Sequence, residues 1–301
     1  MCWKNQQKKK QNMSKVAIIG YGWVGKAMKQ LFPVSVVYDP AQVGLIIASD
    51  DRYDHVVIDD KSIVNECDIA FIGVPTPNRI GATVPGAMPG NPLWKPNEEG
   101  EGVLDTSIVE EIITWCECDL IVIRSTVNPG DCDRWSKQYN KNIVMQPEYL
   151  GETPAHPLLD PKVRPFLVIG GELHNRRKLI NLYATVYNAN TTIRQVTNLE
   201  AEIIKLSENR AIAFKVAQCQ ELYDVCELAG VDYYTIRETV YSDDPRFNLW
   251  WSLVFPDKRG FNSKCIPKDI YAWCAWAESL GYEPKITRAM LEKNKEWINN
   301  A

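Results

Sequence analysis

Cys265 and its neighbours have the residue types of a thiol nucleophile. Pro267, a residue common in the first turn of a helix, follows the cysteine by two positions. A helix N-terminus carries partial positive charge, and Lys264 and Lys268 flank the cysteine in sequence, so both influences favour the thiolate over the thiol. We therefore predict that Cys265 is a nucleophile.

The other cysteines indicate no comparable chemistry. The chain has nine cysteines, an odd number, scattered without Cys-x-x-Cys spacing or a cluster of histidines. This pattern predicts neither a disulfide framework nor a zinc site, and it is typical of reduced cytoplasmic thiols. Cys219, Cys226 and Cys274 fall at helical spacings, where a cysteine usually packs as a small apolar side chain. We expect no metal ion.

A glycine-rich motif near the N-terminus could bind the phosphates of a dinucleotide. It lies between an apolar run and a helical segment and consists of Gly20, Tyr21, Gly22, Trp23, Val24 and Gly25. Gly20 permits a tight turn, Gly22 lets backbone amides approach a pyrophosphate, and Gly25 allows close packing of the helix. The helix N-terminus adds partial positive charge, so the motif predicts a dinucleotide site.

Asp39 predicts which dinucleotide binds. It ends the second apolar run, about 20 residues after the motif, where a carboxylate accepts hydrogen bonds from ribose hydroxyls and repels a 2′-phosphate. This favours NAD over NADP. The alternative is a glycine turn in an ordinary α/β protein, with Asp39 as a solvated strand end.

Lys205 and Asn209 are the third pair that could do chemistry. They are four residues apart in a helical segment and therefore share one face. The apolar flanks of this segment predict that much of it is buried, and a buried lysine is costly without an anionic partner or a function. The alternative is a surface lysine whose ammonium reaches water beside a solvated asparagine, and these residues alone leave both interpretations open.

Alternating strands and helices must position these groups. Apolar, β-branched runs predict strands at residues 16–19, 35–38, 69–74, 120–124, 143–145 and 166–169. Their nearly continuous apolar character is typical of a parallel sheet buried on both faces. A long helix is expected from Glu200 to about Leu228, closed by Gly230, with only helices and loops after it. The sequence thus predicts an α/β fold, in which a doubly wound Rossmann sheet precedes a long helix and a small helical domain.

Domain boundaries follow from this pattern. Residues 1–12 are polar and lysine-rich and are expected to be a disordered extension, residues 13–197 the NAD-binding domain, and residues 198–301 a helical domain for dimerisation and catalysis. Between Asn78 and Gly102, glycine and proline are frequent, which predicts either a mobile lid or a disordered insertion.

Composition excludes several classes of partner. The net charge of −4 gives no basic surface of the kind that neutralises nucleic acid. No apolar run approaches the roughly 20 residues that cross a bilayer, and the N-terminus lacks the apolar stretch of a secretory signal. We expect a soluble, cytoplasmic protein with a small-molecule substrate.

The motifs together resemble the UDP-glucose/GDP-mannose dehydrogenase family over residues 14 to about 298. Six segments occur in the family's order: GYGWVG at 20–25, FIGVPTP at 71–77, RSTVNPG at 124–130, QPEYLGET at 146–153, EAEIIKLSEN at 200–209 and KCIPKD at 264–269. The resemblance implies oxidation of a nucleotide-sugar C6 alcohol to the carboxylate, with two hydride transfers and two NAD. A UDP-sugar is the expected substrate.

The resemblance also implies catalytic roles. Cys265 matches the nucleophile that forms a thiohemiacetal and then a thioester. Lys205 and Asn209 match the pair that stabilises negative charge on the reacting oxygen. Asp269 matches a carboxylate implicated in proton transfer and water activation, and Glu148 matches a glutamate proposed as the base in thioester hydrolysis.

Further contacts are implied by the same comparison. Thr76, Thr126, Glu152 and Lys268 match family contacts to NAD, alongside the glycine motif and Asp39. Arg246 resembles an arginine that the family supplies to the substrate across a dimer interface, although the spacing from Arg246 to the cysteine is a few residues longer than in the family. The substrate contacts implied are Glu148, Lys205, Asn209, Arg246 and Gly260.

The chain departs from the family pattern in two places. The family has two glycines before the residue that precedes its cysteine, and this chain has Asn262 and Ser263, whose side chains could reshape the sugar pocket. The sequence ends at Ala301, about where the family continues into a second Rossmann-like domain that holds the nucleotide. We therefore expect the protein to recruit a separate chain that supplies this domain, to bind its substrate differently, or to bind it weakly. The resemblance also implies a homodimer built on the long helix.

Three functions remain open from the sequence. The first is a thiol-dependent nucleotide-sugar 6-dehydrogenase. The second is a dehydrogenase that removes one hydride from a smaller hydroxy acid, against which Cys265 argues, because a single transfer needs no covalent intermediate. The third is a catalytically silent NAD-binding assembly partner, favoured by Asn262 and Ser263 and by the absent domain.

Overall fold

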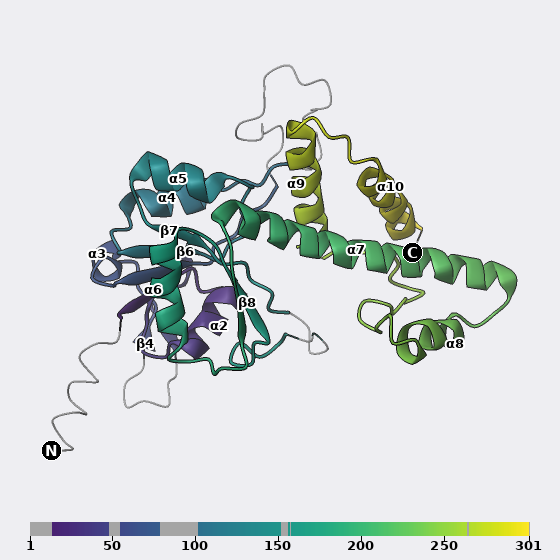
Figure 1. The fold of residues 1–301 in the computed structure, drawn as a ribbon, viewed down its shortest axis with the longest axis horizontal. Coiled ribbons are helices and arrows are strands. Elements are labelled where there is room, and N and C mark those ends of the chain that lie inside the picture. Colours follow the sequence, from purple (N-terminus) through teal and green to yellow (C-terminus); the bar gives the residue numbers. More distant parts are fainter. Residues whose placement is uncertain are drawn as a thin grey trace. The chain divides into compact units, whose positions relative to one another are not determined.

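A computed structural model of the protein describes residues 14–47, 55–78, 102–151, 156, 158–263 and 265–300 (Figure 1). The chain divides into two compact units. The first unit comprises residues 1–77 and 105–205, and the second unit comprises residues 78–104 and 206–301.

A parallel five-stranded sheet forms the centre of the first unit. Its order is β2-β1-β5-β6-β7, with β1 at Val16–Ile19, β2 at Val36–Tyr38, β5 at Ile69–Ile72, β6 at Leu120–Ile123 and β7 at Ile143–Met145. Apolar residues fill both faces of these strands, because each strand lies between two layers of helices. The predicted parallel sheet is confirmed. The chain runs from β1 to β2 on one side and then crosses over to β5 on the other side of β1, which creates the switch point where α/β proteins bind ligands.

Helices cover both faces of this sheet. On one face Ile19, Ile72 and Ile123 pack with α4 (Ser107–Trp115) and α5 (Asp131–Tyr139). On the other face Ile18 and Phe71 pack with α2 (Trp23–Leu31) and α6 (Leu173–Tyr183). A short helix, α3 (Lys61–Val64), adds Val64 to the first of these cores. The sheet is therefore doubly wound, as predicted.

Smaller strands lie outside this sheet. β3 (Ile46–Ile47) pairs antiparallel with β4 (His55–Val56), and β8 (Phe166–Ile169) pairs parallel with β9 (Thr192–Gln195). The sequence predicted β8 but not β3, β4 or β9. Strand β9 has the sequence TIRQ and is mostly exposed, so it carries no apolar run to reveal it.

Helices dominate the second unit. The long helix α7 (Asn198–Ala229) begins in the first unit, has 32 residues, and ends at Gly230, whose φ of +68° confirms the predicted glycine stop. After it come α8 (Tyr233–Glu238), a short π-helical segment η2 (Thr239–Asp243), α9 (Ile266–Ser279) and α10 (Lys285–Asn299). Among the described residues, no helix combines the length and apolar character needed to cross a bilayer.

The predicted lid or insertion between Asn78 and Gly102 lies largely outside the described residues. Residues at its two ends are described, and hydrogen bonds join them. The Asn78 side-chain amide donates to the Gly102 carbonyl at 2.8 Å, and Asn78 bridges to Leu104 in antiparallel fashion. The predicted disordered extension at residues 1–12 also lies outside the described residues.

Candidate active site

The glycine motif forms a tight turn between β1 and α2. Gly20 has φ of +91°, and a Cβ there would lie 2.5 Å from the Gly73 carbonyl oxygen at the end of β5. A Cβ on Gly25 would collide with the Gly20 carbonyl. By contrast, no heavy atom lies within 4 Å of a Cβ position on Gly22. Two glycines are therefore required by packing, and the third leaves open space at the start of α2.

Asp39 ends β2 and lies against this turn. One carboxylate oxygen accepts hydrogen bonds from the Tyr21 amide and the Gln42 side chain, both at 2.8 Å. The other oxygen accepts from the Ala41 amide at 3.0 Å and caps the short 3₁₀ helix η1 (Pro40–Gln42). Asp39 is half-buried, and its carboxylate is fixed beside the glycine turn by groups from both segments.

These residues fit a dinucleotide. The N-cap of α2 is Gly22, which has no side chain to satisfy the first amides of the helix, and the first turn contains no acidic residue that would repel a phosphate. The open space at Gly22 would admit a pyrophosphate, and Asp39 lies where a ribose would follow. These residues would hold NAD.

Thr76 and Thr126 join the ends of two neighbouring strands. The Thr76 hydroxyl donates to the Thr126 carbonyl at 2.7 Å, and the nearby Ser125 hydroxyl exchanges two 2.8 Å hydrogen bonds with the backbone of Val74. The segments after β5 and β6 are therefore held together at the carboxyl edge of the sheet, where the dinucleotide contacts are predicted.

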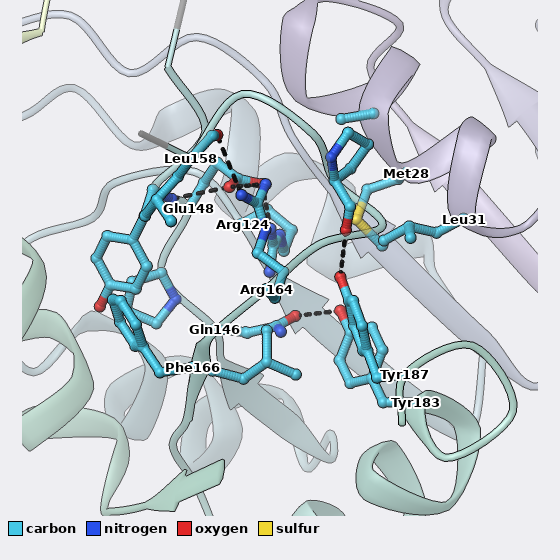
Figure 2. A pocket seen from close by; sticks show the side chains of 15 residues that line it. Met28, Leu31, Arg124, Gln146, Glu148, Leu158, Arg164, Phe166, Tyr183 and Tyr187 are labelled. Atoms are coloured by element: carbon cyan, nitrogen blue, oxygen red, sulfur yellow. Dashed lines mark hydrogen bonds and ion pairs between the residues drawn. The ribbon is translucent and has the colours of Figure 1, made fainter. Parts of the chain in front are cut away.

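Glu148 follows β7 and faces a buried cluster of polar side chains. Figure 2 shows its carboxylate converging with Arg124 and Arg164. It forms an ion pair and hydrogen bond with Arg124 and lies 3.5 Å from the Arg164 guanidinium. The cavity beside this cluster measures only about 10 Å³, so it cannot hold a nucleotide sugar. The described side chains of this cluster are closely packed.

The charge of Glu148 is determined by these contacts. Burial acts to raise the pKa of the Glu148 carboxyl, but the positive charges of Arg124 and Arg164 and hydrogen bonds to the carboxylate outweigh it, so the pKa lies below its ordinary value. Neither arginine is predicted from the sequence to belong to the site. Their signal was weak: Arg124 directly follows a fully buried strand, where an arginine needs a partner.

Lys205 lies in the first unit on the first half of α7. Its ammonium donates to the backbone carbonyl of Glu148 at 2.8 Å and lies 5.4 Å from the centre of the Tyr149 ring. The sequence left open whether this lysine is solvated or buried with a partner. It is half-buried and hydrogen-bonded to a neutral carbonyl, and no carboxylate among the described residues forms an ion pair with it.

Asn209 and Asp269 form a buried pair in the second unit. The Asn209 side-chain amide donates to one oxygen of Asp269 at 2.5 Å, and Lys268 lies 2.7 Å from the other oxygen. The Asp269 side chain has an exposed fraction of only 1%. Two helices, α7 and α9, thus bring together three of the predicted site residues. Lys268, predicted to contact NAD, here pairs with Asp269.

Cys265 is the N-cap residue of α9. It is exposed, whereas the other seven described cysteines are buried. The expectation that Cys219, Cys226 and Cys274 pack as apolar side chains is consistent with their burial. The Ser263 hydroxyl accepts a hydrogen bond from the Ile266 amide at 3.1 Å, so it satisfies one of the first amides of the helix. Lys264 and Glu152 lie outside the described residues.

The segment before Cys265 is anchored by a residue that the sequence analysis missed. The Asn294 side chain accepts from the Phe261 amide at 2.8 Å and donates to the Phe261 carbonyl at 3.0 Å. The neighbouring Gly260 has φ of +73°, and a Cβ there would lie 2.6 Å from the Asn294 oxygen. Glycine at position 260 therefore leaves room for the hydrogen bonds between Asn294 and Phe261. This structural role differs from the predicted substrate contact of Gly260.

Arg246 lies away from these groups along the chain and pairs locally. Its guanidinium forms hydrogen bonds of 2.5–3.0 Å with the carboxylate of Asp244, two residues earlier. The Arg246 side chain is 80% exposed. Its predicted contact with a substrate across a dimer stays a prediction.

Comparison with known proteins finds a matching family model and similar sequences. Residues 199–296 match the UDP-glucose/GDP-mannose dehydrogenase family, central domain. The UDP-glucose 6-dehydrogenase of Rickettsia typhi is 29% identical over 182 residues, which cover 58% of this chain and 41% of the relative. The UDP-glucose 6-dehydrogenase AglM of Haloferax volcanii is 26% identical over 251 residues, covering 78% of this chain and 54% of the relative. The chain thus spans about half the length of these curated relatives.

Solved structures agree on the fold. A UDP-glucose dehydrogenase from Pyrobaculum islandicum superposes with a TM-score of 0.71 at 22% identity, over 95% of this chain and 68% of that one. A 3-hydroxyisobutyrate dehydrogenase from Mycobacterium tuberculosis gives 0.65 at 14% identity, over 94% and 93%. The sequence matches make this chain similar to the UDP-glucose/GDP-mannose dehydrogenase family, whose central domain its residues 199–296 match, and the solved structures share its fold.

Proposed function

We propose that this chain oxidises the C6 alcohol of a nucleotide sugar to the carboxylate, with NAD as the oxidant and Cys265 as the covalent nucleophile. The observation that carries the proposal is the exposed Cys265 at the N-terminus of α9, the helix that also carries the buried Asp269 bonded to Asn209. Sequence similarity to two named UDP-glucose 6-dehydrogenases supports the substrate class.

The glycine turn and Asp39 would hold the cofactor. NAD accepts a hydride from carbon when it is bound. Gly22 supplies the open approach to the α2 amides, and Asp39 supplies acceptors for ribose hydroxyls beside them. A carboxylate at this position would repel a 2′-phosphate, so we propose NAD and not NADP.

The reaction requires two oxidations and one hydrolysis. In the first, the C6 alcohol loses a proton and a hydride and becomes an aldehyde. The Cys265 thiolate then adds to the aldehyde carbon to give the anion of a thiohemiacetal, which loses a second hydride to become a thioester. Water cleaves the C–S bond, which releases the carboxylate and two protons and restores the thiolate. Two NAD are reduced for each sugar.

The polar side chains have separate tasks in this scheme. Lys205 and the Asn209 amide would stabilise negative charge on the reacting oxygen, and the Glu148 carbonyl accepts a hydrogen bond from the Lys205 ammonium at 2.8 Å. Asp269 accepts hydrogen bonds from Asn209 and Lys268, which fixes the Asn209 amide and would let the carboxylate relay a proton. We retain Thr76, Thr126, Glu152 and Lys268 as proposed cofactor contacts, and Glu148, Arg246 and Gly260 as proposed substrate contacts. Glu148 also stays the proposed base of thioester hydrolysis.

Recognition of the nucleotide half is a further part of the proposal. The relatives are about twice as long as the part this chain matches, and we propose that sequence beyond this match, in the same or another chain, contributes nucleotide contacts. We also propose a homodimer built on α7 and a cytoplasmic location.

The test is a count of NADH per substrate molecule. Purified protein is mixed with NAD and a panel of UDP- and GDP-sugars, and NADH is followed by absorbance. We expect two NADH per sugar from the wild type, and with Cys265→Ala either no turnover or arrest after one. Cys274→Ala is the matched control, because Cys274 lies on the same helix but is buried.

Two other results would replace the proposal. One NADH per molecule of a small hydroxy acid, with Cys265→Ala as active as wild type, would indicate a hydroxy-acid dehydrogenase, a class to which the fold alone is also similar. No turnover despite tight NAD binding would indicate a silent binding partner, for which the exposed side chains of Asn262 and Ser263 are the first candidates.

A further inference from the structure

Glu202 is a buried carboxyl that the proposed mechanism does not use. It lies on α7, three residues before Lys205, and is 1% exposed. Its described hydrogen-bond partners are uncharged, and burial raises the pKa of this carboxyl to about 8. An apolar side chain would fill the same space without the cost of burying a carboxyl. The hydrogen bonds of Glu202 are therefore what distinguishes it from an apolar residue.

These hydrogen bonds hold the start of α5. One carboxyl oxygen accepts from the Gly130 amide at 2.6 Å, and the other accepts from the Cys132 amide at 2.9 Å. Gly130 is the N-cap of α5 and has φ of +98°. The first amides of a helix have no partner within that helix, so Glu202 supplies acceptors for them from another helix.

Asp131 lies between these two amides and holds the loop that precedes α5. One oxygen of its buried carboxylate accepts from the backbone amide of Asn128 at 3.2 Å and from the Asn128 side chain at 3.1 Å. The same oxygen accepts from the Thr106 hydroxyl at 3.2 Å. Fixing the backbone at residues 130–132 therefore fixes Asp131, and through Asp131 the backbone at Asn128.

The other end of this loop is attached to the segment after β5. The Thr126 carbonyl accepts from the Thr76 hydroxyl at 2.7 Å, and Ser125 is bonded to the backbone of Val74. Thr76 and Thr126 are both proposed cofactor contacts. Residues 125–130 are thus held at their start by the segment after β5 and at their end by a side chain of α7.

We propose that Glu202 is a positioning residue for the cofactor site, which fixes the start of α5 and, through Asp131, holds the loop of residues 125–130 so that Thr126 can contact NAD. The effect on NAD rests on the proposed function. The effect on the loop does not, so the two can be tested separately.

The first test needs no cofactor. Hydrogen exchange of the Asn128 amide, which Glu202 does not touch, is measured by NMR in wild type, Glu202→Met and Glu200→Met. Methionine has no oxygen to accept from either amide of α5, so we expect Glu202→Met to raise the exchange rate at Asn128 about 10-fold. Glu200 is exposed on the same helix and accepts from Thr197, so Glu200→Met should leave this rate unchanged.

The second test measures NAD binding by calorimetry. We expect the Kd for NAD to rise about 10-fold in Glu202→Met, to rise less in Glu202→Gln, which keeps one acceptor, and to stay unchanged in Glu200→Met. Unfolded protein lowers the number of binding sites and not the affinity of the folded fraction, so the Kd separates positioning from stability. Circular dichroism checks the fold of each variant. Unchanged Asn128 exchange and unchanged Kd in folded Glu202→Met and Glu202→Gln would overturn the proposal.

The third test uses turnover of a nucleotide sugar. We expect the KM for NAD to rise with the Kd, whereas kcat at saturating NAD should change less than about two-fold. A fall in kcat with an unchanged KM for NAD would indicate that Glu202 acts on Lys205 and would overturn the proposal.

Failure of the proposed function would give a different pattern. If no nucleotide sugar reacts, the dehydrogenase activity is refuted, and the NAD-binding and exchange results stand. If the wild type does not bind NAD, the proposed cofactor is refuted, and the exchange rate at Asn128 alone decides whether Glu202 holds the loop.

Discussion

Two buried glutamates of the first unit lie in contrasting surroundings. Glu148 faces two arginines, and its pKa is lowered although burial acts to raise it. Glu202, on α7, accepts hydrogen bonds from the backbone amides of Gly130 at 2.6 Å and Cys132 at 2.9 Å and from the Cys132 thiol, and burial raises its pKa to about 8. Both carboxyls are hydrogen-bonded to amides. The difference shows that uncharged hydrogen-bond donors do not offset the loss of hydration, whereas two guanidiniums do.

The largest expected effect comes from removing the carboxylate between the arginines. Glu148→Leu leaves two buried guanidiniums facing each other without a counter-charge, so we expect it to destabilise the protein by about 3–5 kcal/mol. Urea denaturation of the variant and of wild type measures the difference. A loss below about 1 kcal/mol would mean that water already solvates the arginines, and the contrast with Glu202 would disappear.

A smaller loss is expected at Glu202. Glu202→Gln keeps the size of the side chain but has one acceptor oxygen for two amides, so one buried amide loses its partner, at a cost of about 1–3 kcal/mol. The same urea experiment measures it. The two amides lie at the N-terminus of α5. Hydrogen exchange of the Gly130 and Cys132 amides should therefore be faster in the variant, whereas exchange at the C-terminus of that helix should not change.

The two glutamates should give opposite dependences of stability on pH. The pKa of Glu202 is raised from 4.5 to about 8 on folding, so its contribution is complete below pH 4.5 and is lost as pH rises toward 8. The pKa of Glu148 is lowered, so its contribution is complete above 4.5 and is lost on acidification. The stability advantage of wild type over Glu202→Gln should therefore shrink from pH 5 to pH 8. An advantage that grows over this range would contradict the raised pKa.

The smallest effect is expected at an exposed ion pair of similar chemistry. Arg246 and Asp244 form hydrogen bonds as short as those of buried pairs, yet the arginine is 80% exposed. Water and salt screen such a pair, so Asp244→Asn should leave the melting temperature unchanged within error. A measurably lower melting temperature would show that this loop is less solvated than its exposure indicates. Burial would then be a weaker explanation of the difference between this pair and the ion pairs of Glu148.

Much of the fold could be predicted because the relevant signals are local. Strand β6 has the sequence LIVI and is buried on both faces, and Gly20 and Gly25 stand where a turn and a close helix require them. The edge strands could not be predicted, since β9 is polar and β3 and β4 have two residues each. For them, the pairing partner and not the sequence pattern determines the structure.

In the candidate site, too, the residues with a local sequence signal could be predicted and the contacts between distant residues could not. The residue types at Cys265, Asn209 and Asp269 were evident from sequence, but the hydrogen bond between Asn209 and Asp269 joins residues 60 apart. The anchors Arg124, Arg164 and Asn294 escaped prediction for this reason, because each acts on a group that is distant in sequence. Spacing along one helix or strand reveals a face, whereas a contact between elements depends on the whole fold.

Helix α7 has a consequence for how the protein unfolds. Its first turns supply Ala201 and Glu202 to the core of the first unit, and later turns supply Ala213 and Cys219 to clusters of the second unit. This single helix of 32 residues therefore contributes side chains to the cores of both units. Because helix formation is cooperative, melting either interior removes support from the other, so heat should melt the two units in a single transition.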